Sequence, residues 1–121
     1  MLLVRYAGHS LLFTGDLREE GQRRLLSLPA MHVDVLQSPH HGSAAANTAA
    51  LAQWAQPKVV VSCQGPPLTM KDVAKPYREA GAEFLSTWAH GAVTVRVHES
   101  GVVVETYRTG ERIVVRGPGA Q

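Results

Sequence analysis

The feature that most constrains the fold is a series of short apolar runs, bounded by turn residues or by segments with helical spacing. Runs of this kind are typical of strands buried in a sheet. They cover residues 2–6, 10–13, 33–36, 59–62, 84–85, 93–97, 102–107 and 113–115. The first two flank Ala7-Gly8-His9, a short turn that predicts a β-hairpin. No run approaches the ~18 apolar residues that a membrane-spanning helix needs.

Helical segments separate the earlier runs. Residues 17–28 place leucines among charged residues, which suits a surface helix. Asn47 is a candidate N-cap for a second helix. Thr69, with Asp72 three residues later, resembles the capping box of a third helix that ends at Gly81. We therefore expect three modest helices between the strands.

Strands that alternate with helices and end in an antiparallel region predict an α/β fold, a mixed sheet with helices on one face. Three modest helices cannot cover both faces of such a sheet. The apolar inner strands favour a covering partner over solvent for the second face. We expect a single domain, or a piece of one, over residues 1–116 and a disordered tail over residues 117–121.

Composition sets further limits. A hydrophobic content of 45% with 18% charged residues indicates a globular chain. The formal net charge of +2 is compatible with a polyanionic partner and does not demand one. The single cysteine, Cys63, excludes an internal disulfide and a thiolate cluster. Because Cys63 follows the apolar run 59–62, the sequence predicts a core thiol.

Asp16 is the first candidate site residue, because it follows the second apolar run in Thr14-Gly15-Asp16. Side chains at strand ends leave the core while their backbone stays rigidly held. A carboxylate there can bind one cation or bridge two. The alternative is structural, since Asp16 with Glu19 also matches an N-cap and its N3 partner for the next helix.

The second candidate site is the loop Pro39-His40-His41-Gly42-Ser43, which follows the apolar run 33–36. Neighbouring side chains diverge, so two adjacent histidines rarely reach one ion together. One would ligate while the other orients or transfers a proton. The glycine allows close approach of an anion such as phosphate, and Ser43 adds a hydroxyl. The alternative is an exposed turn that contains histidine. The remaining histidines, at positions 9, 32, 90 and 98, are interpreted as surface residues.

Together these motifs resemble the metallo-β-lactamase-like domain of ComEC/Rec2-type DNA-uptake competence proteins. The resemblance rests on residues 11–16 (Leu-Leu-Phe-Thr-Gly-Asp) and residues 33–43, with their His-His-Gly-Ser ending. It continues through residues 57–62, through the segment that ends at residue 81, and into residues 88–93. It therefore covers nearly the whole chain and implies the C-terminal half of an αββα sandwich.

The resemblance implies a metal-dependent hydrolase that acts as a nuclease on DNA, within a parent protein that is integral to a bacterial membrane. Asp16 would be the metal-bridging aspartate, and His40 and His41 would be metal ligands or phosphate contacts. We expect His40, His41 and Ser43 as catalytic residues and Asp16, His40 and His41 as ligands of Zn²⁺ or Mn²⁺.

Two departures from the family pattern weaken this site. The family's His-x-His-x-Asp-His run belongs to the N-terminal half of the fold and does not occur here. Residues 67–72 stand where the family has a Gly-His-Pro-His-like sequence, and they contain no histidine. A catalytic zinc usually takes three protein ligands. We therefore expect weak or no metal binding, and no turnover, by this chain alone.

Three hypotheses follow. The chain is part of an active hydrolase, and the upstream half of the same fold supplies the other ligands. Alternatively it is a degenerate, non-catalytic module that binds DNA or supports a competence channel. In the third hypothesis it is an unrelated small α/β domain that associates with itself through an uncovered sheet face.

Overall fold

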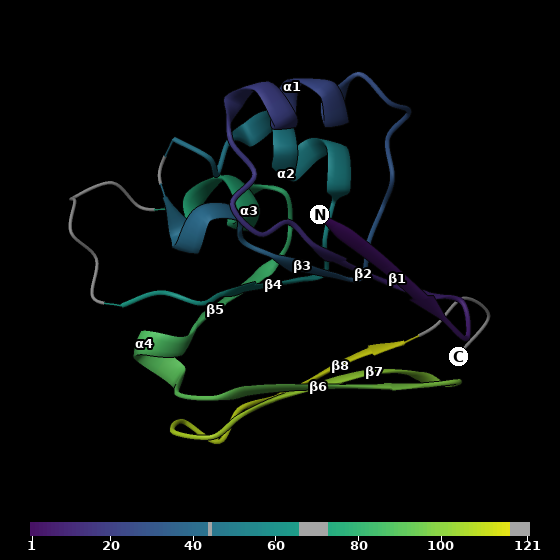
Figure 1. The fold of residues 1–121 in the computed structure, drawn as a ribbon. Coiled ribbons are helices and arrows are strands. Elements are labelled where there is room, and N and C mark those ends of the chain that lie inside the picture. The colour runs from purple at the N-terminus through teal and green to yellow at the C-terminus, as the bar shows by residue number, and fades with distance from the viewer. Residues whose placement is uncertain (44, 66–72, 117–121) are drawn as a thin grey trace.

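The computed structural model describes residues 1–43, 45–65 and 73–116. They form two sheets with helices packed outside the larger one (Figure 1). In chain order the elements are β1 (Leu2–Tyr6), β2 (His9–Phe13), α1 (Glu19–Leu26), β3 (Val35–Gln37), the 3₁₀ turn η1 (Pro39–Gly42), α2 (Ala49–Ala55), β4 (Val59–Ser62), α3 (Lys75–Glu79), β5 (Glu83–Ser86), α4 (Thr87–His90), β6 (Val93–His98), β7 (Gly101–Thr106) and β8 (Arg112–Arg116).

The larger sheet is mixed, with the strand order β1-β2-β3-β4-β5. β1 pairs antiparallel with β2 through the two-residue turn Ala7-Gly8, whose positive φ angles of 51° and 84° suit a tight hairpin. The β2-β3, β3-β4 and β4-β5 pairs are parallel. The smaller sheet, β6-β7-β8, is antiparallel throughout. The mixed α/β class and the predicted strands are confirmed, with small shifts at strand ends.

The larger sheet carries two cores because side chains alternate between its faces. On one face, Leu12, Leu36 and Val60 pack against α1, α2 and α3. On the other face, the neighbouring residues of the same strands pack against the smaller sheet. This second core contains Leu11, Val35, Val59, Leu85, Val102, Val104 and Val115.

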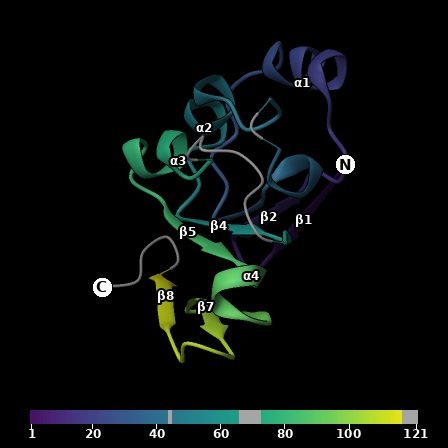
Figure 2. The same ribbon diagram turned by 90° about the vertical axis from the view of Figure 1, so that its left-hand side faces the viewer.

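The second face is therefore covered by the chain itself. Figure 2 shows the smaller sheet beneath the larger one, with α4 at the passage from β5. The expectation that this face awaits a partner, and with it self-association through an uncovered sheet face, is wrong. The valines at alternate positions of β6 and β7 explain the difference, because they give the C-terminal hairpin an apolar face of its own.

The helices begin at different residues from those predicted. The N-cap of α1 is Arg18, which makes no side-chain cap, so the interpretation of Asp16 as a cap is wrong. The N-cap of α2 is Thr48, whose hydroxyl accepts from the Leu51 amide at 3.1 Å, and not Asn47. α3 begins at Lys75, and the predicted capping box at residues 69–72 lies outside the described residues. So does the predicted tail at residues 117–121.

Within the described part of the chain, no helix has the length and apolar character needed to cross a membrane.

Candidate functional site

The parallel strands bring the candidate residues together. β2, β3 and β4 are neighbours that run in the same direction, so their carboxyl ends meet at one edge of the sheet. Asp16 follows β2, His41 follows β3, and Cys63 follows β4. These three residues lie far apart in the sequence but line one hollow of about 230 Å³, together with Gly15, Gln37 and Ser38. This is the position at which α/β sheets commonly bind ligands.

Asp16 and His41 face each other across this hollow. The distance from Asp16 Oδ1 to His41 Nε2 is 3.8 Å, and both side chains are exposed. The turn before Asp16 is held by the Thr14 hydroxyl, which donates to the Gln37 carbonyl at 2.7 Å. The Gly15 amide also points at Gln37 Oε1, at 3.4 Å. The carboxylate is thus presented by a backbone that is tied to β3.

His41 is oriented by a backbone carbonyl. Its Nδ1 lies 3.1 Å from the Cys63 carbonyl oxygen. A carbonyl only accepts, so Nδ1 carries the proton and Nε2 presents its lone pair toward Asp16 when the ring is neutral. The backbone of His41 has φ = 50°, the left-handed region that non-glycine residues seldom adopt. Conformations of this kind gather at functional sites, where the surrounding structure holds them in place.

The surrounding structure is a buried network centred on Asn47. Its amide nitrogen donates to the carbonyls of Pro39, at 3.2 Å, and Ser43, at 2.7 Å. Its amide oxygen accepts from the Ser38 hydroxyl at 2.7 Å and from the Tyr77 hydroxyl. Asn47 therefore clamps both ends of the turn that carries His41.

The network also affects Tyr77. Burial raises the pKa of this tyrosine well above its usual range, and a hydrogen bond with Ser38 opposes the shift. The sequence does not identify Asn47, Ser38 and Tyr77 as residues that position the site. The one available signal is Asn47, a polar residue close behind the His-His-Gly-Ser motif, and its position also matches a helix cap.

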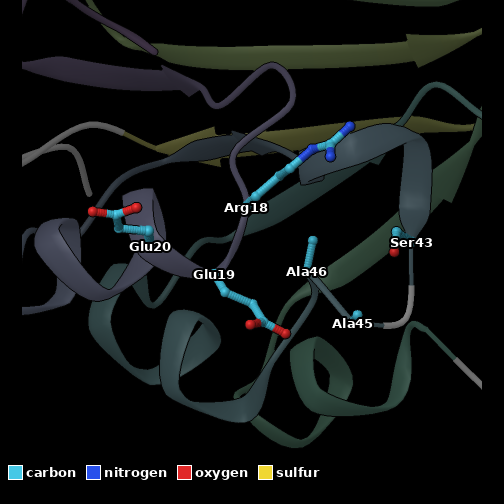
Figure 3. Close-up of a pocket in the computed structure, with 6 residues that line it drawn as sticks. All are labelled: Arg18, Glu19, Glu20, Ser43, Ala45 and Ala46. Atoms are coloured by element: carbon cyan, nitrogen blue, oxygen red, sulfur yellow. The ribbon is translucent and has the colours of Figure 1, made fainter.

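Ser43 belongs to a neighbouring hollow and does not line the Asp16–His41 hollow in the described residues. This second hollow, about 350 Å³, is lined by Arg18, Glu19, Glu20, Ser43, Ala45 and Ala46 (Figure 3). The side chains of Arg18, Glu19 and Glu20 leave the start of α1 in different directions. The structure thus brings together Asp16 and His41 but places the Ser43 side chain in another hollow.

The other candidate residues are placed as follows. His40 lies in η1, and its side chain is outside the described part of the structure. Cys63 is exposed one residue past β4, so the predicted core thiol is wrong. The interpretation of His9 as a surface residue is wrong, because its side chain is fully buried. His9 begins β2, and its Nε2 lies 3.4 Å from the Glu99 carbonyl in the β6–β7 turn. His90 is half-buried and lies 3.7 Å from Glu111.

The donor set fits a cation only in part. Zn–N and Zn–O bonds are about 2.1 Å each, so one ion fits between atoms that lie 3.8 Å apart. A fixed Nδ1 proton is also the usual arrangement around a metal-binding histidine. Among the described residues, however, no group of three or more His, Cys, Asp or Glu side chains is arranged to hold a metal. Asp16 and His41 provide two donors, one fewer than a catalytic zinc site normally has.

Comparison with known proteins gives one informative match. No family model matches the chain. Over 66 residues, 54% of its length, the chain is 33% identical to ComE operon protein 3 of Bacillus subtilis (strain 168). The chain spans only 8% of that protein. The match relates the chain to a protein of the competence system and leaves its activity open.

Proposed function

We propose that this chain acts in DNA uptake, as the C-terminal part of a metal-dependent hydrolase that cleaves phosphodiesters. The observation that carries the proposal is the pairing of Asp16 with an oriented His41 Nε2, at the edge of the sheet where β2, β3 and β4 end. The match to a ComE operon protein supports the biological setting. The resemblance to metallo-β-lactamase-like domains supports the chemistry, and the two-sheet arrangement agrees with half of an αββα sandwich.

In this proposal each residue has a limited role. Asp16 and His41 would hold a divalent cation, Zn²⁺ or Mn²⁺, which when bound supplies a Lewis acid for activating water. Cys63 contributes its backbone carbonyl, which keeps the His41 proton on Nδ1. The remaining ligands would come from another segment of a longer protein. With two donors in place, we expect the isolated chain to bind a cation only weakly and not to cleave DNA.

Metal titration tests the proposed site. We expect Mn²⁺ or Zn²⁺ to bind the chain in calorimetry, and Asp16→Asn to weaken the affinity at least tenfold. His41→Asn should do the same, and asparagine tolerates the left-handed backbone at this position. His98→Gln is the matched control, because His98 is an exposed histidine on the smaller sheet. Equal affinity in all four proteins, or no binding by the unaltered chain, would contradict the site.

Cleavage assays test the proposed hydrolysis of DNA. In the longer protein, divalent metal should support cleavage of linear and plasmid DNA, and Asp16→Asn should abolish it. Cleavage by the 121-residue chain alone would show that the site needs no further ligand.

A second candidate function is a non-catalytic DNA-binding module, favoured by the presence of only two donors in the described site. It predicts DNA binding in EDTA, with an affinity that falls steeply as salt increases. Binding that requires metal, or that does not respond to salt, would exclude this alternative.

A further inference from the structure

Two large aromatic side chains are exposed at the end of the molecule that carries the candidate site. Trp88 lies in α4 and is 49% exposed, and Tyr107 follows β7 and is 87% exposed. Both segments lie at the end where the parallel strands of the larger sheet finish (Figure 1). Trp and Tyr are enriched at binding surfaces, because their rings combine a large apolar area with a polar group. We name these two residues the aromatic pair.

Hydrogen bonds tie the aromatic pair to the wall of the candidate site. Cys63 lines the hollow of that site, and Gln64 is the next residue. The Thr87 hydroxyl accepts from the Gln64 amide at 3.1 Å and donates to the Gln64 carbonyl at 3.2 Å. Trp88 follows Thr87 directly. The first turn of α4 is therefore fixed against the segment that lines the hollow, and Trp88 stands beside the site.

Arg108 joins the two members of the aromatic pair. It follows Tyr107 in the chain, and its Nη1 donates to the Trp88 carbonyl at 2.5 Å. Its backbone amide donates to the His90 carbonyl at 2.9 Å. The segments approach this closely because residue 91 is glycine, with φ = 76°, and a Cβ there would lie 3.0 Å from the Arg108 Cβ. A guanidinium has five N–H donors, so the bond to Trp88 leaves donors for a phosphate.

The charges beside the aromatic pair suit an anionic ligand. Residues 107–112 contain Arg108, Arg112 and one carboxylate, Glu111, which lies 3.7 Å from His90 Nε2. Among the residues that the structure describes, neither arginine takes part in an ion pair. Aromatic rings next to such arginines match both parts of a nucleic-acid strand, because bases stack on rings and phosphates bind guanidinium groups.

We propose that the aromatic pair and Arg108 form a binding subsite for the unpaired bases and the phosphates of a single DNA strand. The choice of DNA rests on the proposed function, whereas the stacking itself needs no metal. Bases of an intact duplex are paired and stacked on one another, so they reach the rings only after they unpair. The bonds to Gln64 and Arg108 hold α4 in place before a ligand arrives, which lowers the cost of binding.

Binding of a labelled oligothymidine strand in EDTA, followed by fluorescence anisotropy, tests this subsite without the metal. Trp88→Leu keeps an apolar side chain but removes the ring, and should weaken the affinity by roughly 5- to 150-fold, the range for the loss of one stacked base. Trp88→Phe should retain most of the affinity, because it keeps a ring. Tyr6→Leu is the matched control, since Tyr6 is 59% exposed but lies at the opposite end of the sheet, in the β1–β2 hairpin.

Two other ligands separate stacking from charge. An abasic strand of the same length keeps the phosphates but has no bases, and a blunt duplex keeps its bases paired. Both should bind more weakly than the oligothymidine strand, and Trp88→Leu should not weaken them further. Equal affinity for the abasic strand, tighter binding of the duplex, or an oligothymidine affinity that neither Trp88→Leu nor Tyr107→Leu reduces would overturn the proposal.

Metal titration of the same variants keeps this proposal distinct from the proposed function. Trp88→Leu should bind Mn²⁺ or Zn²⁺ like the unaltered chain, and in the longer protein it should raise the KM for single-stranded DNA. Strand binding that depends on Trp88, in a protein that neither binds metal nor cleaves DNA, would refute the hydrolase and support the subsite. Metal-dependent cleavage with a KM that Trp88→Leu leaves unchanged would refute the subsite and support the hydrolase.

Discussion

Replacing Asn47 with alanine should destabilise the fold and loosen the turn that carries His41. The side chain is buried and makes four hydrogen bonds, with Ser38, Pro39, Ser43 and Tyr77. Each is worth roughly 1 kcal/mol net, and partners left buried without a hydrogen bond cost more. The expected loss of unfolding free energy is therefore about 3–5 kcal/mol. For a chain of this size that corresponds to a Tm lower by about 10–20 °C.

Urea denaturation followed by circular dichroism measures this loss. Gln53→Ala is the control, because Gln53 is exposed on α2, the helix that follows Asn47, and its removal should change the stability by no more than about 0.5 kcal/mol. A double-mutant cycle with Tyr77→Phe isolates one bond of the network. Since both single variants remove the same hydrogen bond, the double variant should cost about 1 kcal/mol less than their sum.

The proposed positioning role of Asn47 also predicts an effect on metal binding. If Asn47 holds the His41 turn, Asn47→Ala should also weaken metal binding at temperatures where the variant is still folded. A loss below about 1 kcal/mol, full additivity with Tyr77→Phe, or unchanged metal affinity would refute the view that Asn47 positions the site.

Two further predictions concern pH and backbone packing. Burial raises the pKa of Tyr77 in the folded state. Its contribution to stability is therefore complete below the unfolded pKa of about 10, and falls by up to about 1.4 kcal/mol per pH unit above it. Urea titrations from pH 8 to 11.5 should show this fall in the unaltered chain but not in Tyr77→Phe, and parallel curves would contradict it. Gly101→Ala should cost about 2–4 kcal/mol, because a Cβ there would lie 2.4 Å from the Val115 carbonyl oxygen. A Cβ at Gly65 would meet no atom within 4 Å, so Gly65→Ala should be nearly neutral. Thermal melts of the two variants and of the unaltered chain measure the difference.

Local sequence patterns were sufficient to predict the strands. Period-two apolar residues in the 93–97 segment predict β6, and the continuous valine run before Cys63 predicts a strand buried on both faces, as β4 is. The turn Ala7-Gly8 likewise predicts the β1–β2 hairpin. These signals are local because backbone propensity and side-chain alternation act over a few residues. The predictions of the helix starts were less accurate. Asp16 and Asn47 match the residue preferences of helix caps, but in the fold they make other contacts.

The sequence predicts the two motifs of the candidate site, but it does not predict that they lie next to each other. Asp16 and His41 both follow apolar runs, and the sequence identifies each as a strand-end residue. Their separation of 3.8 Å depends on β2 and β3 being parallel neighbours. Strand order is decided by which apolar faces bury one another, a property of the whole chain. The role of the Cys63 carbonyl depends in the same way on the pairing of β3 with β4.

By itself the sequence determined the α/β class, the strand segments and the residue types available for chemistry. Only the tertiary structure decided that the chain covers both faces of its own sheet. It also decided that His9 is buried, that Cys63 is exposed, and that Asn47 clamps a turn. The physical reason is common to all of these. Burial and hydrogen-bond partners are set by contacts between residues distant in sequence, and no local pattern encodes which distant surface a side chain will meet.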